Sequence, residues 1–194
     1  PLGDPLSAQE LVGLSLQMQS IGFSPDFSLC SAGYLERYPE LSDYYRIEER
    51  RDIAEYIYDV NALVRLTGER LHKKKNLISQ FKRAWPGYEV HGLEGRYRKQ
   101  ALGLAEKLLE RFDQPPESLV LEFKAIQSSF EHFDSLGLEG LVLVADGRVA
   151  AFSVFSRLNS TTYDMQFEKA AIAFNGSAQF INQETAAVLS DRCR

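Results

Sequence analysis

The chain has 194 residues and a formal net charge of −5; apolar residues make up 44% of it and charged residues 25%. This composition excludes an intrinsically disordered chain, a collagen-like repeat and a disulfide-rich scaffold, because apolar side chains are plentiful and there are 2 cysteines. No apolar run approaches the ~18 residues of a membrane-spanning helix, and the first residues lack a signal-peptide pattern. We therefore expect a cytoplasmic protein without a transmembrane segment, in which Cys30 and Cys193 are reduced thiols.

The first part of the chain predicts a small unit that begins with a helix. Ser7 and Glu10 have the spacing of a capping box, and apolar residues then recur at helical intervals, which predicts a helix over residues 7–21. Residues 43–50 are predicted to form an exposed, charged strand. The charged stretch 48–52 marks a change in composition, and we place a domain boundary there.

From residue 55 onward, the sequence predicts an α+β fold. The Asp146-Gly147 pair suits a type I′ hairpin turn, so the three strands around and after it are expected to form one antiparallel meander. Helices combined with an antiparallel sheet are typical of an α+β architecture. The predicted strands are 56–60, 88–93, 141–145, 149–155 and 161–170, and the predicted longer helices are 67–85, 96–112, 117–136 and 178–189.

One short segment is strongly basic on an otherwise acidic chain. Residues 65–83 contain seven Lys or Arg residues and one Glu. Most of this segment falls in the predicted helix 67–85, so its basic side chains are expected to lie on a helix surface.

Lys74 has a special place in this helix, because it falls between Leu71 and Ile78 on the apolar stripe. Its neighbours Lys73 and Lys75 point sideways or outwards. One interpretation is an anion site whose outer lysines hold a polyphosphate or a nucleic-acid backbone. The other is a solvated helix face on which Lys74 extends its ammonium group toward water.

A second candidate site lies at the end of the predicted strand 161–170. Glu168 falls near the end of this strand, Lys169 follows it, and Asn175-Gly176-Ser177 forms a turn into the last helix. A carboxylate at a strand end can bind or deprotonate an amine, and a helix N-terminus can hold a phosphate. An ordinary surface Glu and an ordinary turn are the competing interpretations.

The sequence lacks the common motifs of several enzyme classes. It contains no P-loop, no GxSxG nucleophile motif and no HExxH motif. The three histidines, His72, His91 and His132, do not have the spacing of metal ligands. We therefore expect neither a metal nor a cofactor.

Four sequence blocks occur together in a characteristic order. The first joins residues 56–58 (YIY) to residues 66–76 (LTGERLHKKKN), and the others are 121–126 (LEFKAI), 167–170 (FEKA) and 181–184 (INQE). In this combination and order, they resemble the phosphatidylglycerol lysyltransferase C-terminal domain family. The resemblance covers most of the chain and is strongest from Glu55 onward.

The resemblance implies a GNAT-like acyltransferase fold and a role in a bacterial aminoacyltransferase system. The best-known members of this family move an aminoacyl group from aminoacyl-tRNA to a lipid headgroup, so the implied partners are aminoacyl-tRNA and a lipid headgroup at a membrane surface. The resemblance also assigns residues to the site. The implied catalytic set is Glu168, Lys169 and Glu122, and the implied substrate-binding set is Lys73, Lys74, Lys75, Asn76, Asn182 and Glu184.

Two tandem GNAT-like units are a further implication of the resemblance. Residues 1–52 correspond to the C-terminal half of an N-terminal unit, and residues 53–194 correspond to a C-terminal unit without its last strands. Both ends of the arrangement are therefore expected to be truncated. The CoA-binding loop of GNAT enzymes (Gln/Arg-x-x-Gly-x-Gly/Ala) is missing, which argues against an acyl-CoA donor.

Two functions remain open from the sequence. In the first, the domain is an aminoacyl-tRNA-dependent transferase: residues 73–75 hold tRNA phosphates, Glu168 orients an amine, and catalysis relies on positioning and charge stabilisation. In the second, it is a non-catalytic GNAT-like scaffold that binds an anionic partner or another protein. A cleft between the basic helix and the end of strand 161–170 favours the first function, and a closed junction favours the second.

Overall fold

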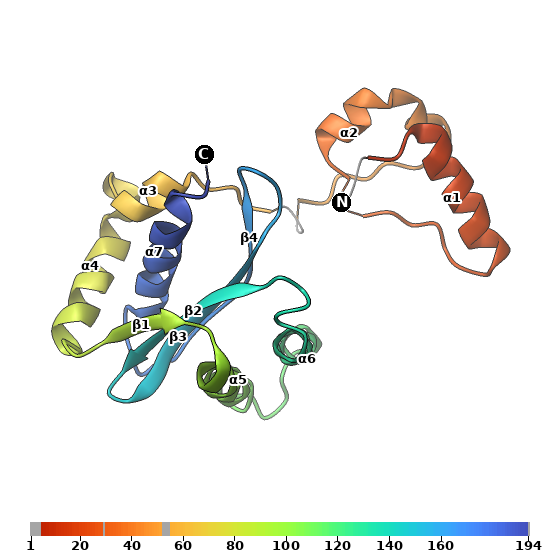
Figure 1. Ribbon diagram of the computed structural model, residues 1–194. Coiled ribbons are helices and arrows are strands. Elements are labelled where there is room, and N and C mark those ends of the chain that lie inside the picture. Colours follow the sequence, from red (N-terminus) through yellow and green to blue (C-terminus); the bar gives the residue numbers. More distant parts are fainter. Residues whose placement is uncertain (1–4, 29, 52–54, 194) are drawn as a thin grey trace. The chain divides into compact units, whose positions relative to one another are not determined.

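The computed structural model describes residues 5–28, 30–51 and 55–193 of the chain (Figure 1). These residues form two compact units, Pro1–Tyr56 and Ile57–Arg194. The division falls a few residues after the boundary expected from the charged stretch 48–52. The assignment of the first unit as half of a GNAT-like domain stays a prediction.

The first unit is built from short helices around a small core. Helix α1 (Ala8–Ser20) begins with the predicted capping box, in which the Ser7 backbone donates to the Glu10 carboxylate at 2.8 Å. Helix α2 (Ala32–Arg37) and the 3₁₀ helix η1 (Pro39–Asp43) follow. Ala8, Leu11 and Leu41 form the buried centre.

The strand predicted over residues 43–50 is absent. The 3₁₀ helix takes the first residue of this segment, and residues 46–50 form irregular chain. Most of these side chains are charged and exposed, so the segment has no apolar face that a sheet would bury.

A four-stranded antiparallel sheet organises the second unit. The strands occur in the order β1 (Glu89–Gly92), β2 (Glu139–Ala145), β3 (Arg148–Arg157) and β4 (Tyr163–Ala170). The predicted meander is confirmed, because β3 pairs with both β2 and β4. The turn between β2 and β3 has positive φ at both central residues, 53° at Asp146 and 68° at Gly147, as a type I′ turn requires.

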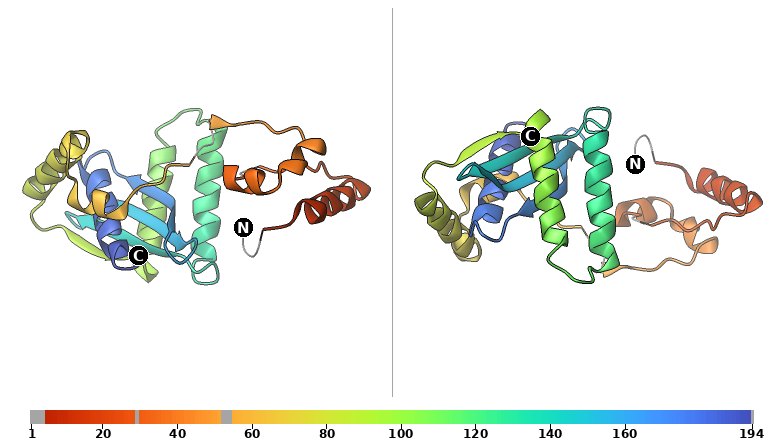
Figure 2. Two further views of the ribbon diagram at one scale, coloured as in Figure 1. Left: turned by 90° about the horizontal axis from the view of Figure 1, so that it is seen from above. Right: turned by 90° about the horizontal axis from the view of Figure 1, so that it is seen from below.

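Helices cover both faces of this sheet (Figures 1 and 2). Helices α5 (Gly95–Leu109) and α6 (Glu117–Glu131) lie on one face. The other face carries α3 (Val60–Arg65), α4 (Glu69–Ala84) and α7 (Ser177–Ser190). The fold class is therefore α+β with an open antiparallel sheet.

Two hydrophobic cores follow from the alternation of side chains along β2 and β3. Val142 and Phe152 point to the α5–α6 face, whereas their neighbours Leu143 and Ala151 point to the face covered by α4 and α7. All four are fully buried, so both faces of the meander are apolar.

The prediction of a strand over residues 56–60 is wrong. Residues 55–59 form irregular chain outside the sheet, and α3 begins at Val60. Tyr56 is 83% exposed and Ile57 92% exposed, so this aromatic and β-branched run is not covered by another layer. Such a run forms a strand only where a neighbouring strand and a core face receive it.

Candidate functional site

Helix α4 presents its lysines in two different environments. Ile78 and Phe81 are buried in the core that α4 shares with α7 and the sheet. Lys74 lies one turn before Ile78 and is half-buried, whereas Lys73 and Lys75 are exposed. The helical spacing thus places one lysine of the three toward the interior of the unit, as the sequence predicts.

Glu168 lies on β4, on the face that α7 covers. It pairs in the sheet with Ser153 of β3, whose side chain bonds to Thr185 of α7 and so points to the same face. Asn182 of α7 donates a hydrogen bond from Nδ2 to Glu168 Oε2 at 2.9 Å. The structure therefore brings together two of the residues that the resemblance assigns to different sets.

Burial raises the pKa of the Glu168 carboxyl above its usual value. The Asn182 hydrogen bond and the positive charge of Lys74 act in the opposite direction, because both favour the carboxylate. Glu168, Asn182 and Lys74 thus form one electrostatic cluster between β4, α7 and α4. A carboxyl group in this environment can exchange a proton nearer neutral pH and can bind an ammonium group.

Lys169 and Glu122 lie on the opposite face of the sheet. Lys169 pairs with Phe152, which belongs to the α5–α6 core, and its Nζ donates to Glu122 Oε2 of α6 at 2.6 Å. Adjacent residues of a strand point to opposite faces, so Glu168 and Lys169 cannot reach the same reacting group through this sheet. The predicted catalytic set is therefore divided into a Glu168 cluster and a Lys169–Glu122 ion pair.

The remaining predicted site residues lie around these two groups. Asn76 is exposed on α4, two residues from Lys74 and therefore on a different side of the helix. Glu184 is half-buried on α7, and the same two-residue offset turns it away from Asn182. The structure does not bring these two side chains into the Glu168 cluster.

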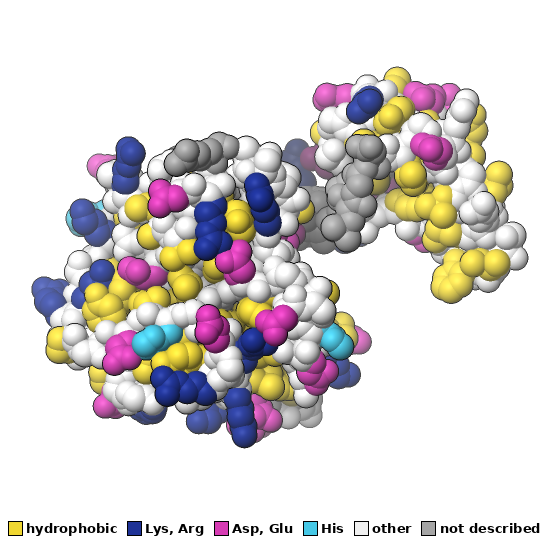
Figure 3. Space-filling model, viewed as in Figure 1, with side chains coloured by type: hydrophobic (Ala, Val, Ile, Leu, Met, Phe, Trp, Pro, Cys, Tyr) yellow, Lys and Arg dark blue, Asp and Glu magenta, His cyan; other side chains and the backbone are white. Residues whose placement is uncertain are grey.

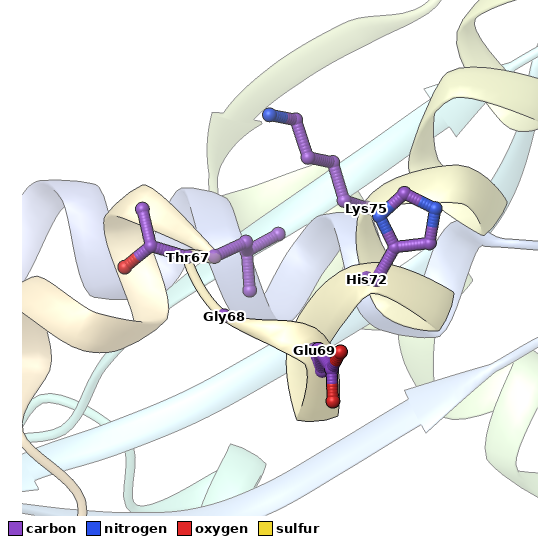
Figure 4. Close-up of a pocket in the computed structure, with 6 residues that line it drawn as sticks. Thr67, Gly68, Glu69, His72 and Lys75 are labelled. Atoms are coloured by element: carbon purple, nitrogen blue, oxygen red, sulfur yellow. The ribbon is translucent and has the colours of Figure 1, made fainter.

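An open hollow of about 460 Å³ lies at the start of α4 (Figure 4). Thr67, His72 and Lys75 are among its lining residues, together with the N-terminal backbone of the helix at Gly68. Several Lys and Arg side chains lie over this part of the second unit in the space-filling view (Figure 3). His72 and Thr67 were not among the predicted site residues, although both fall within the basic block of the sequence.

A buried polar pair beside the Glu168 cluster was also not predicted from the sequence. Ser153 and Thr185 are both fully buried, and their hydroxyl oxygens lie 2.7 Å apart. A Ser inside the apolar strand β3 was the available signal, but its partner on α7 follows from the three-dimensional packing. This pair ties α7 to the sheet next to Asn182.

Neither a metal cluster nor a spanning helix is found in the described part of the chain. In residues 5–28, 30–51 and 55–193, no three His, Cys, Asp or Glu side chains are grouped so as to hold a metal ion. Across the same residues, every helix is too short or too polar to cross a membrane.

This chain is similar to known proteins in both sequence and fold. The family described as "Phosphatidylglycerol lysyltransferase, C-terminal" matches residues 1–194. A solved structure titled "Crystal Structure of Conserved Protein of Unknown Function from Bacteroides thetaiotaomicron VPI-5482" matches with a TM-score of 0.85 and 24% sequence identity. No curated protein matches the chain.

The structural match concerns the fold and extends over 98% of this chain. The chain spans 65% of the length of the Bacteroides protein's chain, so that protein contains additional sequence. The family match covers every position of the present sequence, including the basic helix, β4 and α7. The chain belongs to the phosphatidylglycerol lysyltransferase C-terminal family.

Proposed function

We propose that this domain takes part in transfer of an aminoacyl group from aminoacyl-tRNA to a lipid headgroup or to another hydroxyl or amine acceptor. Membership of the lysyltransferase family supports an aminoacyltransferase-like role. The observation that carries the proposal is the Glu168 cluster, in which a half-buried carboxyl with a raised pKa accepts a hydrogen bond from Asn182 near the charge of Lys74. We further propose that the second unit is a GNAT-like domain and that the first unit is the C-terminal half of another.

The proposed chemistry is direct acyl transfer. The acceptor oxygen or nitrogen attacks the carbonyl carbon of the aminoacyl ester, a new ester or amide bond forms, and the bond to the tRNA ribose oxygen breaks. Glu168 takes the proton from the attacking acceptor and passes it to the ribose oxygen, which leaves as a hydroxyl. Asn182 orients the Glu168 carboxyl, and Lys74 stabilises negative charge.

The exposed side of α4 is proposed to bind the tRNA backbone. Lys73, Lys75 and Asn76 are exposed there, and exposed lysines bind phosphates mainly through screened, salt-dependent attraction. Glu184 is proposed to contact a substrate from the other side of α7. Lys169 and Glu122 have no step in this scheme, because they lie across the sheet from Glu168.

The direct test is an aminoacyl-transfer assay with the purified protein. Charged tRNAs carrying radiolabelled amino acids are incubated with phosphatidylglycerol vesicles or with soluble amine acceptors, and the acceptor fraction is analysed for label and for a mass shift. The proposal predicts transfer from at least one charged tRNA. Deacylated tRNA mixed with free labelled amino acid is the control and should give no labelled acceptor.

A second candidate function is a non-catalytic scaffold that binds an anionic partner. The observation in its favour is that the open hollow lies at the start of α4, with His72 and Lys75 in its lining and without Glu168. Under this alternative, the protein binds a polyanion such as tRNA, and it binds aminoacylated and deacylated tRNA equally well. Binding without transfer in the same assay would favour the scaffold.

A further inference from the structure

The Lys169–Glu122 ion pair borders a cavity on the α5–α6 face of the sheet. The cavity has a volume of about 230 Å³ and lies between the end of α5 and the start of α6. Leu108, Leu119 and Phe123 contribute to its apolar wall. In the view from below in Figure 2, the two helices run side by side in front of the sheet.

The size of this cavity restricts what it can hold. A dry apolar cavity of about 150 Å³ accommodates benzene, and drug-sized ligands occupy about 300–1,000 Å³. A volume of about 230 Å³ therefore suits one branched aliphatic or aromatic group together with a small polar head.

The charges at the wall restrict the head group. Lys169 Nζ carries three donors and the Glu122 carboxylate has two acceptor oxygens, and their mutual bond at 2.6 Å uses one of each. Among the described residues, this leaves donors on Lys169 and an oxygen on Glu122 for a ligand. Their side chains are 22% and 36% exposed, so both are accessible without unfolding of the helices.

A ligand with a single charge can pair favourably with only one of these two side chains. A carboxylate is attracted to Lys169 but repelled by Glu122, and an ammonium group meets the reverse. A zwitterion matches both, and Arg111, which also lines the cavity, adds to the attraction for its carboxylate.

We propose that this cavity binds a small apolar α-amino acid in its free, zwitterionic form. Its side chain fills the apolar hollow, its carboxylate contacts Lys169 and its ammonium group contacts Glu122. The site is separate from the Glu168 cluster, because the sheet lies between them. Its failure or success is therefore independent of the proposed transfer reaction.

Isothermal titration calorimetry of the full chain with L-leucine and L-phenylalanine tests this proposal. Three analogues separate the contributions: 4-methylpentanoate keeps the tail and the carboxylate, 3-methylbutylamine keeps the tail and an ammonium group, and glycine keeps both charges without the tail. We expect L-leucine or L-phenylalanine to bind, and each analogue to bind about tenfold more weakly or worse, because each loses a charged contact or the apolar burial. Binding of 4-methylpentanoate as tight as that of L-leucine, or no binding of either amino acid by the folded protein, overturns the proposal.

Variants locate the bound amino acid. Lys169→Met and Glu122→Gln keep the apolar parts of these side chains and should weaken binding about tenfold or more. Lys124→Met, at an exposed position of the same helix α6, is the matched control and should bind normally. Ala105→Ile leaves the ion pair intact and fills part of the cavity, so it should abolish binding in a protein with an unchanged circular dichroism spectrum. Undiminished binding by Ala105→Ile overturns the proposal whatever the charge variants do.

Discussion

Lys74 differs from its two neighbours in both burial and electrostatic surroundings. It is half-buried and its charge acts on the Glu168 carboxyl, whereas Lys73 and Lys75 are exposed. Removal of a charge from a partly desolvated site costs more than removal of a solvated one. This contrast makes the three consecutive lysines a test of whether α4 faces a site or only solvent.

We predict that Lys74→Ala slows aminoacyl transfer about tenfold or more, because a hydrogen bond or close contact to a charged group is worth about 1.5–3 kcal/mol. Lys73→Ala and Lys75→Ala should slow it about two- to fivefold, and each should lower the salt dependence of tRNA binding by roughly one unit of slope or less. Transfer rates and salt titrations of the three variants measure this. Equal, small effects would identify α4 as a solvated face.

The raised pKa of Glu168 also makes the stability of the protein depend on pH. Because burial raises its pKa in the folded protein, the native state holds this proton to a higher pH than the unfolded chain does. The unfolded state therefore binds fewer protons between the two pKa values, and the free energy of unfolding falls as the pH rises through that window.

We predict that Glu168→Gln removes this pH-dependent fall in the free energy of unfolding. The stability of the variant relative to wild type should therefore increase as the pH rises from the unfolded-state pKa of Glu168 to its folded-state pKa. Urea unfolding at a series of pH values measures the difference. Asp164→Asn, an exposed position on the same strand, is the control and should show no such trend. A difference in unfolding free energy between wild type and Glu168→Gln that stays constant with pH would contradict the partly buried environment of this carboxyl.

At the scale of elements, α7 is held to the sheet by the buried Ser153–Thr185 hydrogen bond. We predict that Thr185→Val costs about 1–3 kcal/mol of unfolding free energy, because it leaves the Ser153 hydroxyl buried without its partner. The double variant Ser153→Ala/Thr185→Val should cost less than the sum of the two single variants. A double-mutant cycle by urea unfolding tests this, and strict additivity would show that the hydroxyls do not depend on each other.

The turn before α7 depends on close contact with α4. Gly176 has a φ of 88°, and a Cβ at this position would collide with the backbone carbonyl of Leu77. We predict that Gly176→Ala destabilises the protein by about 2–4 kcal/mol, from backbone strain plus overpacking. Gly137 has a φ of 62° with open space around it, so Gly137→Ala isolates the strain and should cost about 1 kcal/mol. Thermal unfolding that shows equal losses would exclude the predicted collision.

Local chemistry explains which elements the sequence could predict. The Ser7 capping box and the Asp146-Gly147 turn depend on a few neighbouring residues, and both occur as predicted. The placement of Lys74 follows from helical spacing in the same way. The strand predicted over residues 56–60 does not form, because a run such as YIY forms a strand only where other parts of the chain cover it.

The candidate site shows the same limit. The alternation of side chains along β4 already implies that Glu168 and Lys169 point to opposite faces. Their partners cannot be deduced in this way, because Asn182 and Glu122 come from helices that lie on opposite sides of the sheet. The resemblance places Glu168 and Glu122 in one catalytic set. The packing of α6 and α7 on opposite faces of the sheet is what separates these two carboxyl groups.

At the scale of the whole molecule, the second unit carries every residue of the proposed transfer site. Its two cores bind α4 and α7 to one face of the sheet and α5 and α6 to the other. The Glu168 cluster and the cavity beside Lys169 are thus two separate surfaces of one scaffold. The central claim is that the first of them performs acyl transfer.

Single-turnover transfer from labelled aminoacyl-tRNA, compared between Glu168→Gln and Asp164→Asn, tests that claim most directly. If Glu168 acts on the reacting groups, Glu168→Gln should reduce the transfer rate about 10²-fold or more, the usual size of a general acid–base contribution, with tRNA binding nearly unchanged. Asp164→Asn should retain the wild-type rate. Wild-type transfer in Glu168→Gln, or tRNA binding without any transfer by the wild-type protein, would contradict the account.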